Sequence, residues 1–89
     1  MDKLRAIEYF NRSVEAGSFS AAARALAVST PAVAKLVSAL ERSLGTTLVH
    51  RTNRGLALSA EGERFYATSR RLSADLRDLE AQFGGRSAK

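Results

Sequence analysis

The stretch from residue 18 to residue 45 limits the possible folds most, because it predicts two short helices joined by a tight turn. We expect the first helix at about 19–27, opened by Ser18 or Ser20, and the second at about 30–44. A serine hydroxyl before a helix accepts a hydrogen bond from a backbone N–H that has no partner inside the helix. Serines at both helix starts therefore support this division of the stretch.

Three residues mark the bounds of the second helix. Ser29 suits the N-cap position, and Pro31 falls in the first turn, where its missing N–H costs nothing. Gly45 stands where helices commonly end in a left-handed residue. In the preceding helix, Ala22 and Ala23 are small enough for the two helices to cross closely and steeply. The stretch therefore predicts a helix-turn-helix.

The second helix has two chemically different faces. Its apolar side chains recur at i, i+4, i+7 and i+11, the spacing of one buried stripe: Val33, Val37, Leu40 and Leu44. The opposite face is small, polar or cationic: Thr30, Pro31, Ala34, Lys35, Ser38 and Arg42. In a helix-turn-helix the second helix enters the major groove of DNA, so we predict that this face contacts base edges. An ordinary helical hairpin in an all-helical domain is the alternative.

A short hairpin is expected after the second helix. Between residues 46 and 58, apolar residues flank a polar segment, and two extended segments can meet around 53–55. A hairpin this short must pack against the helices, as the wing of a winged helix does. Arg51 and Arg54 lie near its tip, and we predict that they contact phosphate or the minor groove. Two solvated arginines in a turn are the alternative.

The charge distribution favours a polyanionic partner. The 89 residues have a net charge of +5. Between residues 16 and 59, five lysine and arginine side chains face a single acidic residue, Glu41, with His50 in addition. The positive charge is thus concentrated on the helix-turn-helix and the expected wing, which a merely solvated surface does not explain.

The N-terminal segment predicts one structural helix, at about 2–16. An apolar stripe at intervals of three to four residues supports it: Leu4, Ile7, Phe10 or Asn11, and Val14. Asp2 is the expected N-cap and Gly17 the expected end. We expect Phe19 to fill the core between this helix and the helix-turn-helix.

A long helix is expected from Ser59 to about Phe83, with two glycines after it. Its apolar residues form what we call the apolar seam: Phe65, Leu72, Leu76, Leu79 and Phe83. A helix of this length spans roughly 36 Å, which exceeds such a small core. We predict that the seam pairs with a second copy of the chain from Leu76 to Phe83, whereas packing on the first helix explains only the part near Phe65.

The composition argues against several classes of protein. The chain has no cysteine and one histidine, so it has no disulfide framework, no thiol chemistry and no cysteine-based zinc site. Paired nucleophiles and bases, metal-ligand clusters and glycine-rich phosphate loops are absent from the sequence, so we expect no enzyme, metal or cofactor. No apolar run approaches the ~20 residues of a membrane span, and no signal peptide is visible.

The order of elements and several phrases resemble one family. The phrases are EAGSFSAAARALAVSTPAVAKLVSALERSLGTTLVHRT and R-x-x-x-LS-x-EG. Within them, GSF, AA, L-x-VS-x-PAV, LE-x-x-LG and R-x-x-R are all in register. The chain is similar to the N-terminal DNA-binding domain of LysR-type transcriptional regulators from residue 2 to about residue 84.

This resemblance implies a mainly α fold: a winged helix-turn-helix of three helices and a short two-stranded wing, followed by a long linker helix. It implies a bacterial, cytoplasmic and nucleoid-associated regulator that binds a pseudo-palindromic promoter site as a homodimer with antiparallel linker helices. A higher oligomer of the full-length protein is left open. In the family a larger domain follows the linker helix, so we expect this chain to be a fragment and any small-molecule effector to bind in that missing domain.

We therefore expect three segments: 1–58 as the winged helix-turn-helix DNA-binding domain, 59–84 as the linker and dimerisation helix, and 85–89 as a flexible tail or the start of a hinge. The predicted DNA-binding residues are Ser29, Thr30, Pro31, Ala34, Lys35, Ser38, Arg51 and Arg54. The predicted dimerisation residues are Phe65, Leu72, Leu76, Leu79 and Phe83.

The chain departs from the usual family residues at a few positions. Thr30 replaces the usual Gln and Ala34 the usual Ser on the presumed base-reading face, so these changes bear on operator preference and not on binding itself. Leu36 stands where a polar residue is frequent. Val49 and Glu61 replace a frequent Phe and Ala, which are milder changes.

Two other functions stay open from the sequence: a non-specific nucleic-acid binder, and a protein-interaction helical module whose basic face is incidental. An interaction module has no need of Arg51 and Arg54 at a hairpin tip. A non-specific binder has no need of a helix whose small residues permit close approach to bases.

Overall fold

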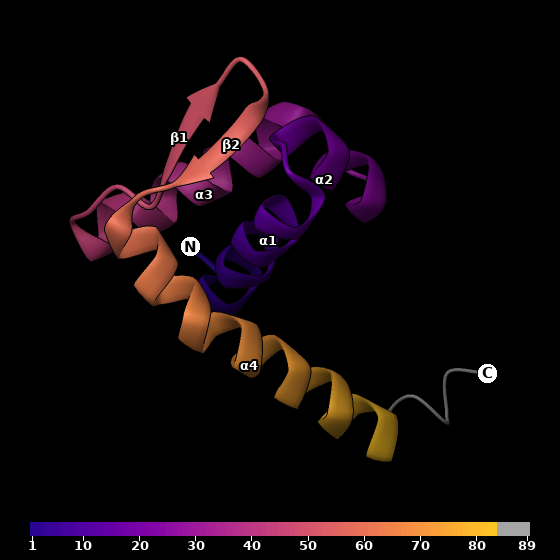
Figure 1. The fold of residues 1–89 in the computed structure, drawn as a ribbon. Coiled ribbons are helices and arrows are strands. Elements are labelled where there is room, and N and C mark those ends of the chain that lie inside the picture. Colours follow the sequence, from indigo (N-terminus) through magenta and orange to yellow (C-terminus); the bar gives the residue numbers. More distant parts are fainter. Residues whose placement is uncertain (84–89) are drawn as a thin grey trace.

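The computed structural model describes residues 1–83, in which four helices surround a small core and a two-stranded antiparallel sheet stands beside them (Figure 1). The elements follow in this order: α1 (Lys3–Ala16), α2 (Phe19–Leu26), α3 (Thr30–Leu44), β1 (Val49–Thr52), β2 (Gly55–Leu58) and α4 (Ala60–Gln82). The hairpin tip and the far end of α4 lie at opposite ends of the molecule (Figure 1). The predicted winged helix-turn-helix with a long final helix is confirmed.

The predicted caps explain where the helices begin. Backbone N–H groups in the first turns donate to Asp2 Oδ1 at 3.1 Å in α1 and to Ser29 Oγ at 3.2 Å in α3. At the start of α2 the N-cap is Ser18, whose hydroxyl accepts from the Ala21 N–H at 3.0 Å, and not Ser20. Each hydroxyl or carboxylate satisfies one N–H that the helix itself leaves unpaired.

The turn between α2 and α3 is tight because Ala27 adopts a left-handed conformation, with φ 60°. Helix α2 therefore ends at Leu26, one residue earlier than predicted. The two helices are bent by 110° at this break. Ala22 and Ala23 are almost completely buried there, which confirms that small side chains accompany a steep crossing.

The core lies between α1, α2 and α3 and is closed by residues from the hairpin and α4. Its buried members are Ala6, Phe10, Phe19, Ala22, Ala23, Val33, Val37, Leu40 and Leu48. Phe10 meets Phe65 of α4 edge to face, with ring centroids 5.4 Å apart. Phe19 is buried, as predicted, and it connects the helix-turn-helix to the hairpin side of the core.

Two leucines predicted to be buried are exposed. Leu4 is 46% exposed and Leu44 is 41% exposed. Leu4 borders an open hollow with Glu8 and Leu76, because Ala6 and Phe10 occupy the buried face of α1. Leu44 is the last residue of α3, beyond the part of the apolar stripe that faces the core, and it borders a second open hollow.

The hairpin has the shortest common loop, the two residues 53–54 between β1 and β2. Thr52 pairs with Gly55 next to this loop. Gly55 has φ 128°, and a Cβ there would collide with the carbonyl oxygen of Gly17. The Leu56 N–H donates to that same carbonyl at 3.0 Å. The close approach fixes the hairpin against the α1–α2 turn.

The apolar seam of α4 divides into two parts, which corrects the sequence prediction. Contact with α1 does not end near Phe65 but continues through Ser69 and Ser73, and Leu76 is half-buried beside α1. The exposed part of the seam consists of Leu72 (48%), Leu79 (54%) and Phe83 (70%). The glycine pair expected to stop the helix lies outside the described residues.

No single helix within residues 1–83 is both long and apolar enough to cross a membrane. Helices α2 and α3 pass that test only when they are counted together across their bend, and their apolar side chains form the core described above.

Candidate nucleic-acid interface

The surface of α3 that faces away from the core forms one exposed line. Pro31, Lys35, Ser38 and Arg42 recur at intervals of four, three and four residues, and all four are exposed. This interval keeps side chains on a single face of a helix. The line holds two cations and no acidic residue, so it offers a cationic ridge of the diameter that fits a DNA major groove.

Three other predicted residues lie at the edges of this line. Ser29 is exposed and uses its hydroxyl as the α3 N-cap. Thr30 is half-buried and borders a hollow toward the hairpin. Ala34 is half-buried and packs partly against the core. Its methyl group thus presents only a small apolar surface between Thr30 and Ser38.

Arg54 lies in the two-residue loop at the hairpin tip and is exposed. Its backbone N–H donates to Thr52 Oγ1 at 3.1 Å, and that hydroxyl donates to the Gly55 carbonyl at 3.3 Å. The Thr52 side chain therefore braces the loop from inside. The Arg54 side chain remains free to extend beyond it.

Arg51 is arranged differently from Arg54. Its guanidinium carbon lies 4.8 Å from the centroid of the Phe19 ring, at the first residue of α2. A guanidinium over an aromatic face is held by the ring quadrupole while its N–H donors stay available at the edges. Arg51 is thus positioned over the start of α2, whereas Arg54 projects from the tip.

A hollow of about 220 Å³ connects these parts. It lies between the starts of α2 and α3 and the hairpin, and it brings Thr30 and Arg51 together: Ser18, Phe19, Ser20, Thr30, Arg51, Thr52, Gly55 and Leu56. The positive ends of two helix dipoles and one guanidinium converge there, which favours an anionic group such as phosphate. Lys35 is separate from this hollow and borders another one beside α1.

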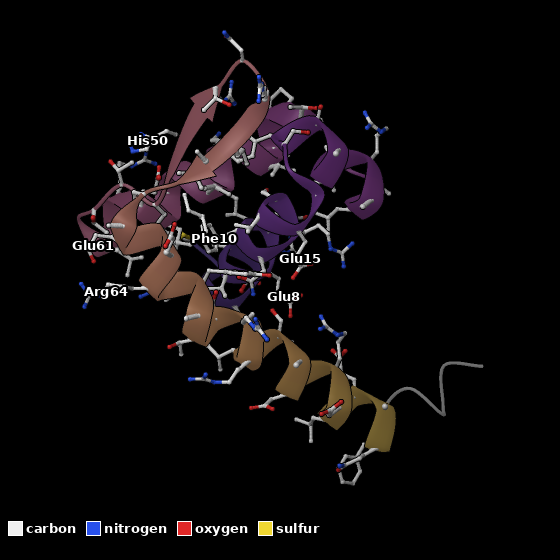
Figure 2. All side chains as sticks on the ribbon, in the orientation of Figure 1. Glu8, Phe10, Glu15, His50, Glu61 and Arg64 are labelled. Atoms are coloured by element: carbon white, nitrogen blue, oxygen red, sulfur yellow. The ribbon has the colours of Figure 1, made fainter. Side chains whose placement is uncertain are left out.

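The cations of this surface are not neutralised by acidic neighbours. The ion pairs among the described residues are Asp2–Arg5, Arg12–Glu15 and Glu61–Arg64, and all of them lie on α1 with its N-cap or on α4. Figure 2 shows His50 on the hairpin, where it is exposed, well apart from the labelled Glu8 and Glu15 of α1. The surface of α3 and the hairpin therefore keeps its net positive charge for a ligand.

The acidic residue of this region, Glu41, makes hydrogen bonds inside the protein, a role that was not predicted from the sequence. Glu41 Oε2 accepts the N–H groups of Leu48 and Val49 at 2.7 and 3.1 Å. The carboxylate on α3 thereby holds the start of β1. The sequence signal was a lone glutamate just before the end of α3 and seven residues ahead of an extended segment. Ser20, at the start of α2, also borders the hollow and was not predicted as a site residue.

The charged and polar side chains of this surface suit binding of a polyanion. Across residues 1–83, no three histidine or acidic side chains come close enough to hold a metal ion. Burial raises the pKa of Tyr66 above its ordinary value, with further contributions from the charge and hydrogen bond of Glu15. Tyr66 lies on α4, away from the α3 line and the hairpin tip. The cationic ridge of α3, the hollow and the projecting Arg54 together suit recognition of an extended anion.

A family model described as "Bacterial regulatory helix-turn-helix protein, lysR family" matches residues 4–63. Among curated proteins, an HTH-type transcriptional repressor of Pseudomonas aeruginosa is 40% identical over 88 residues, which is 99% of this chain and 28% of the relative. The HTH-type transcriptional regulator TcbR of a Pseudomonas species is 38% identical over 85 residues, 96% of this chain and 28% of the relative. The chain thus spans about 28% of the length of these relatives.

Solved structures match over the whole chain. The DNA complex of the CbnR DBD superposes with a TM-score of 0.79 at 35% identity and covers 100% of both chains. The complex of the BenM DBD with catB site 1 DNA superposes with a TM-score of 0.84 at 28% identity and covers 100% of this chain and 99% of the other.

Proposed function

Since this chain belongs to the lysR family of bacterial regulatory helix-turn-helix proteins, we propose that it binds double-stranded promoter DNA in a sequence-specific manner. The observation that supports this most directly is the match of the entire chain to a domain of similar fold that was solved on DNA. The exposed cationic line of α3 and the unpaired hairpin arginines give the same conclusion from this chain's own residues.

In this proposal α3 lies in the major groove. Lys35 donates to guanine O6 or N7, and Thr30 offers a hydroxyl for hydrogen bonding and a methyl group for contact with thymine. Pro31 and Ala34 allow close approach because they are small and apolar, and Ser29 and Ser38 lie at the ends of the contact. The exposure of Lys35, Ser38 and Pro31 supports this assignment.

The hairpin and the adjoining hollow would hold the DNA backbone. A phosphate in the hollow would meet the start of α2 and the edge of the Arg51 guanidinium, while Arg54 would reach the minor groove or the next phosphate. Backbone contacts of this kind fix the position of the protein on the duplex, and base contacts select the sequence.

We further propose that two copies pair through antiparallel α4 helices, so that a homodimer binds a pseudo-palindromic site. The exposed apolar residues of α4 support this, since about half or more of the surface of Leu72, Leu79 and Phe83 is left exposed within residues 1–83. Leu76 lies at the margin of the pairing surface, and Phe65 contributes mainly through its contact with Phe10. A two-fold protein demands a two-fold site, with half-sites centred about one helical turn apart or a multiple of it.

In the same proposal, residues 1–58 form the DNA-binding unit and the helix that follows them serves for linking and dimerisation. The end of the expected 59–84 segment and the whole expected segment 85–89 lie outside the described residues. The regulator would act in the cytoplasm, on the nucleoid. Any effector would bind to a part of the regulator beyond this chain, where further oligomerisation would also be decided.

The proposal is tested by selecting binding sites for the 89-residue chain from a random pool of duplex DNA. The affinity for the selected duplex is then compared with that for a scrambled duplex of equal composition at two stated salt concentrations. We expect tighter binding of the selected duplex, and we expect Lys35→Ala to lose about 1–3 kcal/mol at one base position. Arg77→Ala, on the exposed side of α4, is the matched control for loss of one positive charge.

Equal affinities for selected and scrambled duplexes would indicate a non-specific nucleic-acid binder. Absence of binding to either duplex would leave a protein-interaction module. Both outcomes contradict the proposal.

A further inference from the structure

A buried polar cluster joins α1 to α4. Asn11 and Ser69 are 2% exposed, and Ser73 is 5% exposed. Asn11 Nδ2 donates to the Ser69 carbonyl oxygen at 2.9 Å and to Ser73 Oγ at 2.7 Å. Ser69 Oγ donates to Asn11 Oδ1 at 2.6 Å. We call these three residues the Asn11 cluster.

The Asn11 cluster restricts how α4 can lie on α1. Both ends of one side-chain amide are engaged, so a slide or rotation of α4 would leave buried donors and acceptors without partners. Apolar contacts are more tolerant, because they lose little when two helices shift slightly. A single buried asparagine that fixes the register of paired helices is a known use of such groups.

The Asn11 cluster lies close to the point where α4 extends away from the rest of the domain. The ring centroids of Phe65 and Tyr66 lie 5.4 and 6.3 Å from the ring centroid of Phe10. The Asn11 cluster follows these rings along α4. Beyond Ser73 only Ala74 and Leu76 are half-buried among the described residues, and the far half of α4 stands away from the other elements (Figure 2). The Asn11 cluster is therefore the last hydrogen-bonded contact before α4 leaves the domain.

The length beyond the cluster turns small tilts into large displacements. From Ser73 to Gln82 there are nine further helical residues, about 13 Å at 1.5 Å each. A 20° tilt would move the end of that segment by about 5 Å, which exceeds the ~3.4 Å rise of one base pair. The direction in which α4 leaves the domain is therefore a quantity to which DNA recognition by a pair of chains is sensitive.

We propose that the Asn11 cluster sets the orientation of α4 relative to α3 and so determines the half-site spacing that a pair of chains accepts. The cluster acts at a distance from the DNA and contributes specificity through geometry. This inference rests on the proposed function, both in DNA binding and in pairing through α4.

The first measurement concerns orientation and needs no DNA. Because the chain has no cysteine, Arg24→Cys on α2 and Arg77→Cys on α4 accept one spin label each, and both positions are exposed. Double electron–electron resonance on doubly labelled chains, diluted with an excess of unlabelled chains, then gives the distribution of distances between the two labels within one chain. We expect a narrow distribution in the parent and a broader or shifted one after Asn11→Leu, which keeps the side-chain shape and removes the hydrogen bonds.

Two further variants make the orientation measurement decisive. Ser69→Ala with Ser73→Ala removes the cluster from the α4 side and replaces Asn11→Leu if that variant does not fold by circular dichroism. Ser13→Ala is the matched control, because Ser13 is equally buried but donates only to the Tyr9 carbonyl within α1, at 2.8 Å. The control should keep the narrow distribution.

The second measurement concerns DNA. Two copies of the selected half-site are placed on duplexes that differ by one base pair in spacing, which rotates one half-site by about 35° around the other. We expect the parent and Ser13→Ala to prefer one spacing. Asn11→Leu should reduce that preference about fivefold or more, the size of a typical coupling between two sites, with unchanged affinity for a single half-site.

An unchanged distance distribution in both cluster variants would overturn the inference. So would a changed distribution with an unchanged spacing preference. Failure of the parent to distinguish selected from scrambled half-sites would refute the proposed function instead, and that result is visible before any cluster variant is measured.

Discussion

Arg51 and Arg54 lie three residues apart on one hairpin, yet their surroundings assign them different tasks. The Arg51 guanidinium lies 4.8 Å from the Phe19 ring centroid, so much of its freedom is already lost before a ligand arrives. Arg54 extends from a two-residue loop that Thr52 braces. Of the two, Arg54 is the residue whose side chain would be ordered by DNA.

We predict that Arg54→Ala weakens DNA binding without lowering stability. If Arg54 contacts phosphate, the slope of log K against log salt should fall by about one. If it enters the minor groove, binding to A·T-rich flanks should suffer most. Titrations at several salt concentrations on duplexes with A·T-rich and G·C-rich flanks measure both. A slope and flank preference equal to those of the parent would contradict the placement of Arg54 on DNA.

A second prediction at this scale concerns Tyr66 and alkaline pH. Burial first, and then the charge and hydrogen bond of Glu15, raise the pKa of Tyr66 above its ordinary value of 10.0. The native state thus binds this proton more tightly than the unfolded chain does. The resulting stabilisation is present below pH ~10 and is lost as pH rises through the raised native pKa.

Tyr66→Phe removes that titration. We therefore expect the free energy of unfolding of the parent to fall more steeply than that of Tyr66→Phe as pH rises above ~10. Denaturant titrations of both proteins across this range measure the difference. Parallel curves would show that neither burial nor the Glu15 contact at 3.2 Å raises the pKa of Tyr66.

At the scale of elements, the hairpin is held from three sides. Glu41 of α3 accepts two N–H groups at the start of β1, and the Gly17 carbonyl accepts the Leu56 N–H of β2. From the side of α4, the Ser59 N–H donates to the Leu48 carbonyl at 2.9 Å. A two-stranded hairpin is marginal by itself, so these contacts supply the rigidity that a wing needs to hold its arginines in place.

For Glu41→Ala, two explanations predict opposite changes in the affinity for DNA. Removing an acidic residue from a basic DNA-binding surface should by charge alone tighten binding. Loss of the bracing should instead weaken it, since two hydrogen bonds to a charged acceptor, each worth about 1.5–3 kcal/mol, are gone and the wing is no longer held. We expect weaker binding of the selected duplex.

Glu41→Gln is the matched variant, because its amide oxygen can still accept both N–H groups. It should bind at least as tightly as the parent. Glu63→Ala, an exposed acidic residue on α4, controls for the change in net charge. Tighter binding by Glu41→Ala than by the parent would show that the bracing contributes nothing to recognition.

For the molecule as a whole, the long axis follows from α4. The described residues extend 41 Å in one direction and 24 and 23 Å in the others. Helix α4 accounts for this shape, since 23 residues span about 35 Å. Leu79 and Phe83 lie beyond the part of α4 that packs on α1, and together with the exposed Leu72 they form the surface that we propose for pairing.

We predict that Leu79→Asp yields a folded monomer that binds a single half-site and loses cooperative binding to the full site. Each buried large apolar side chain contributes about 1.5–3 kcal/mol relative to exposure, and a carboxylate in the pairing surface would also carry a desolvation cost. Leu79 is a better target than Leu76, because Leu76 also packs beside α1. Sedimentation over a range of concentrations and full-site titrations measure the effect.

Arg77→Ala, which changes an exposed neighbour off the seam, is the control and should leave assembly intact. A parent chain that stays monomeric at every concentration, with Leu79→Asp unchanged on the full site, would rule out pairing through α4.

The sequence by itself determined the elements whose causes are local. Ser18 and Ser29 cap the helices that follow them by accepting the backbone N–H three residues further on. Gly17 and Gly45 end helices in left-handed conformations. The two-residue loop of the hairpin is fixed by its immediate neighbours. These interactions act within a few residues, so periodicity and turn chemistry were sufficient to predict the helix-turn-helix and the wing.

Only the tertiary structure decided how far α4 packs on α1. Hydrophobic periodicity gives no weight to serine, so Ser69 and Ser73 could not be recognised as buried from the pattern, and it placed Asn11 on the stripe of the first helix only as an alternative to Phe10. Their partners lie 58 and 62 residues apart in sequence. The exposure of Leu4 and Leu44 and the position of Arg51 over Phe19 have the same origin. Each depends on which distant element arrives beside the residue, and that is settled by packing of the whole chain and not by its local pattern.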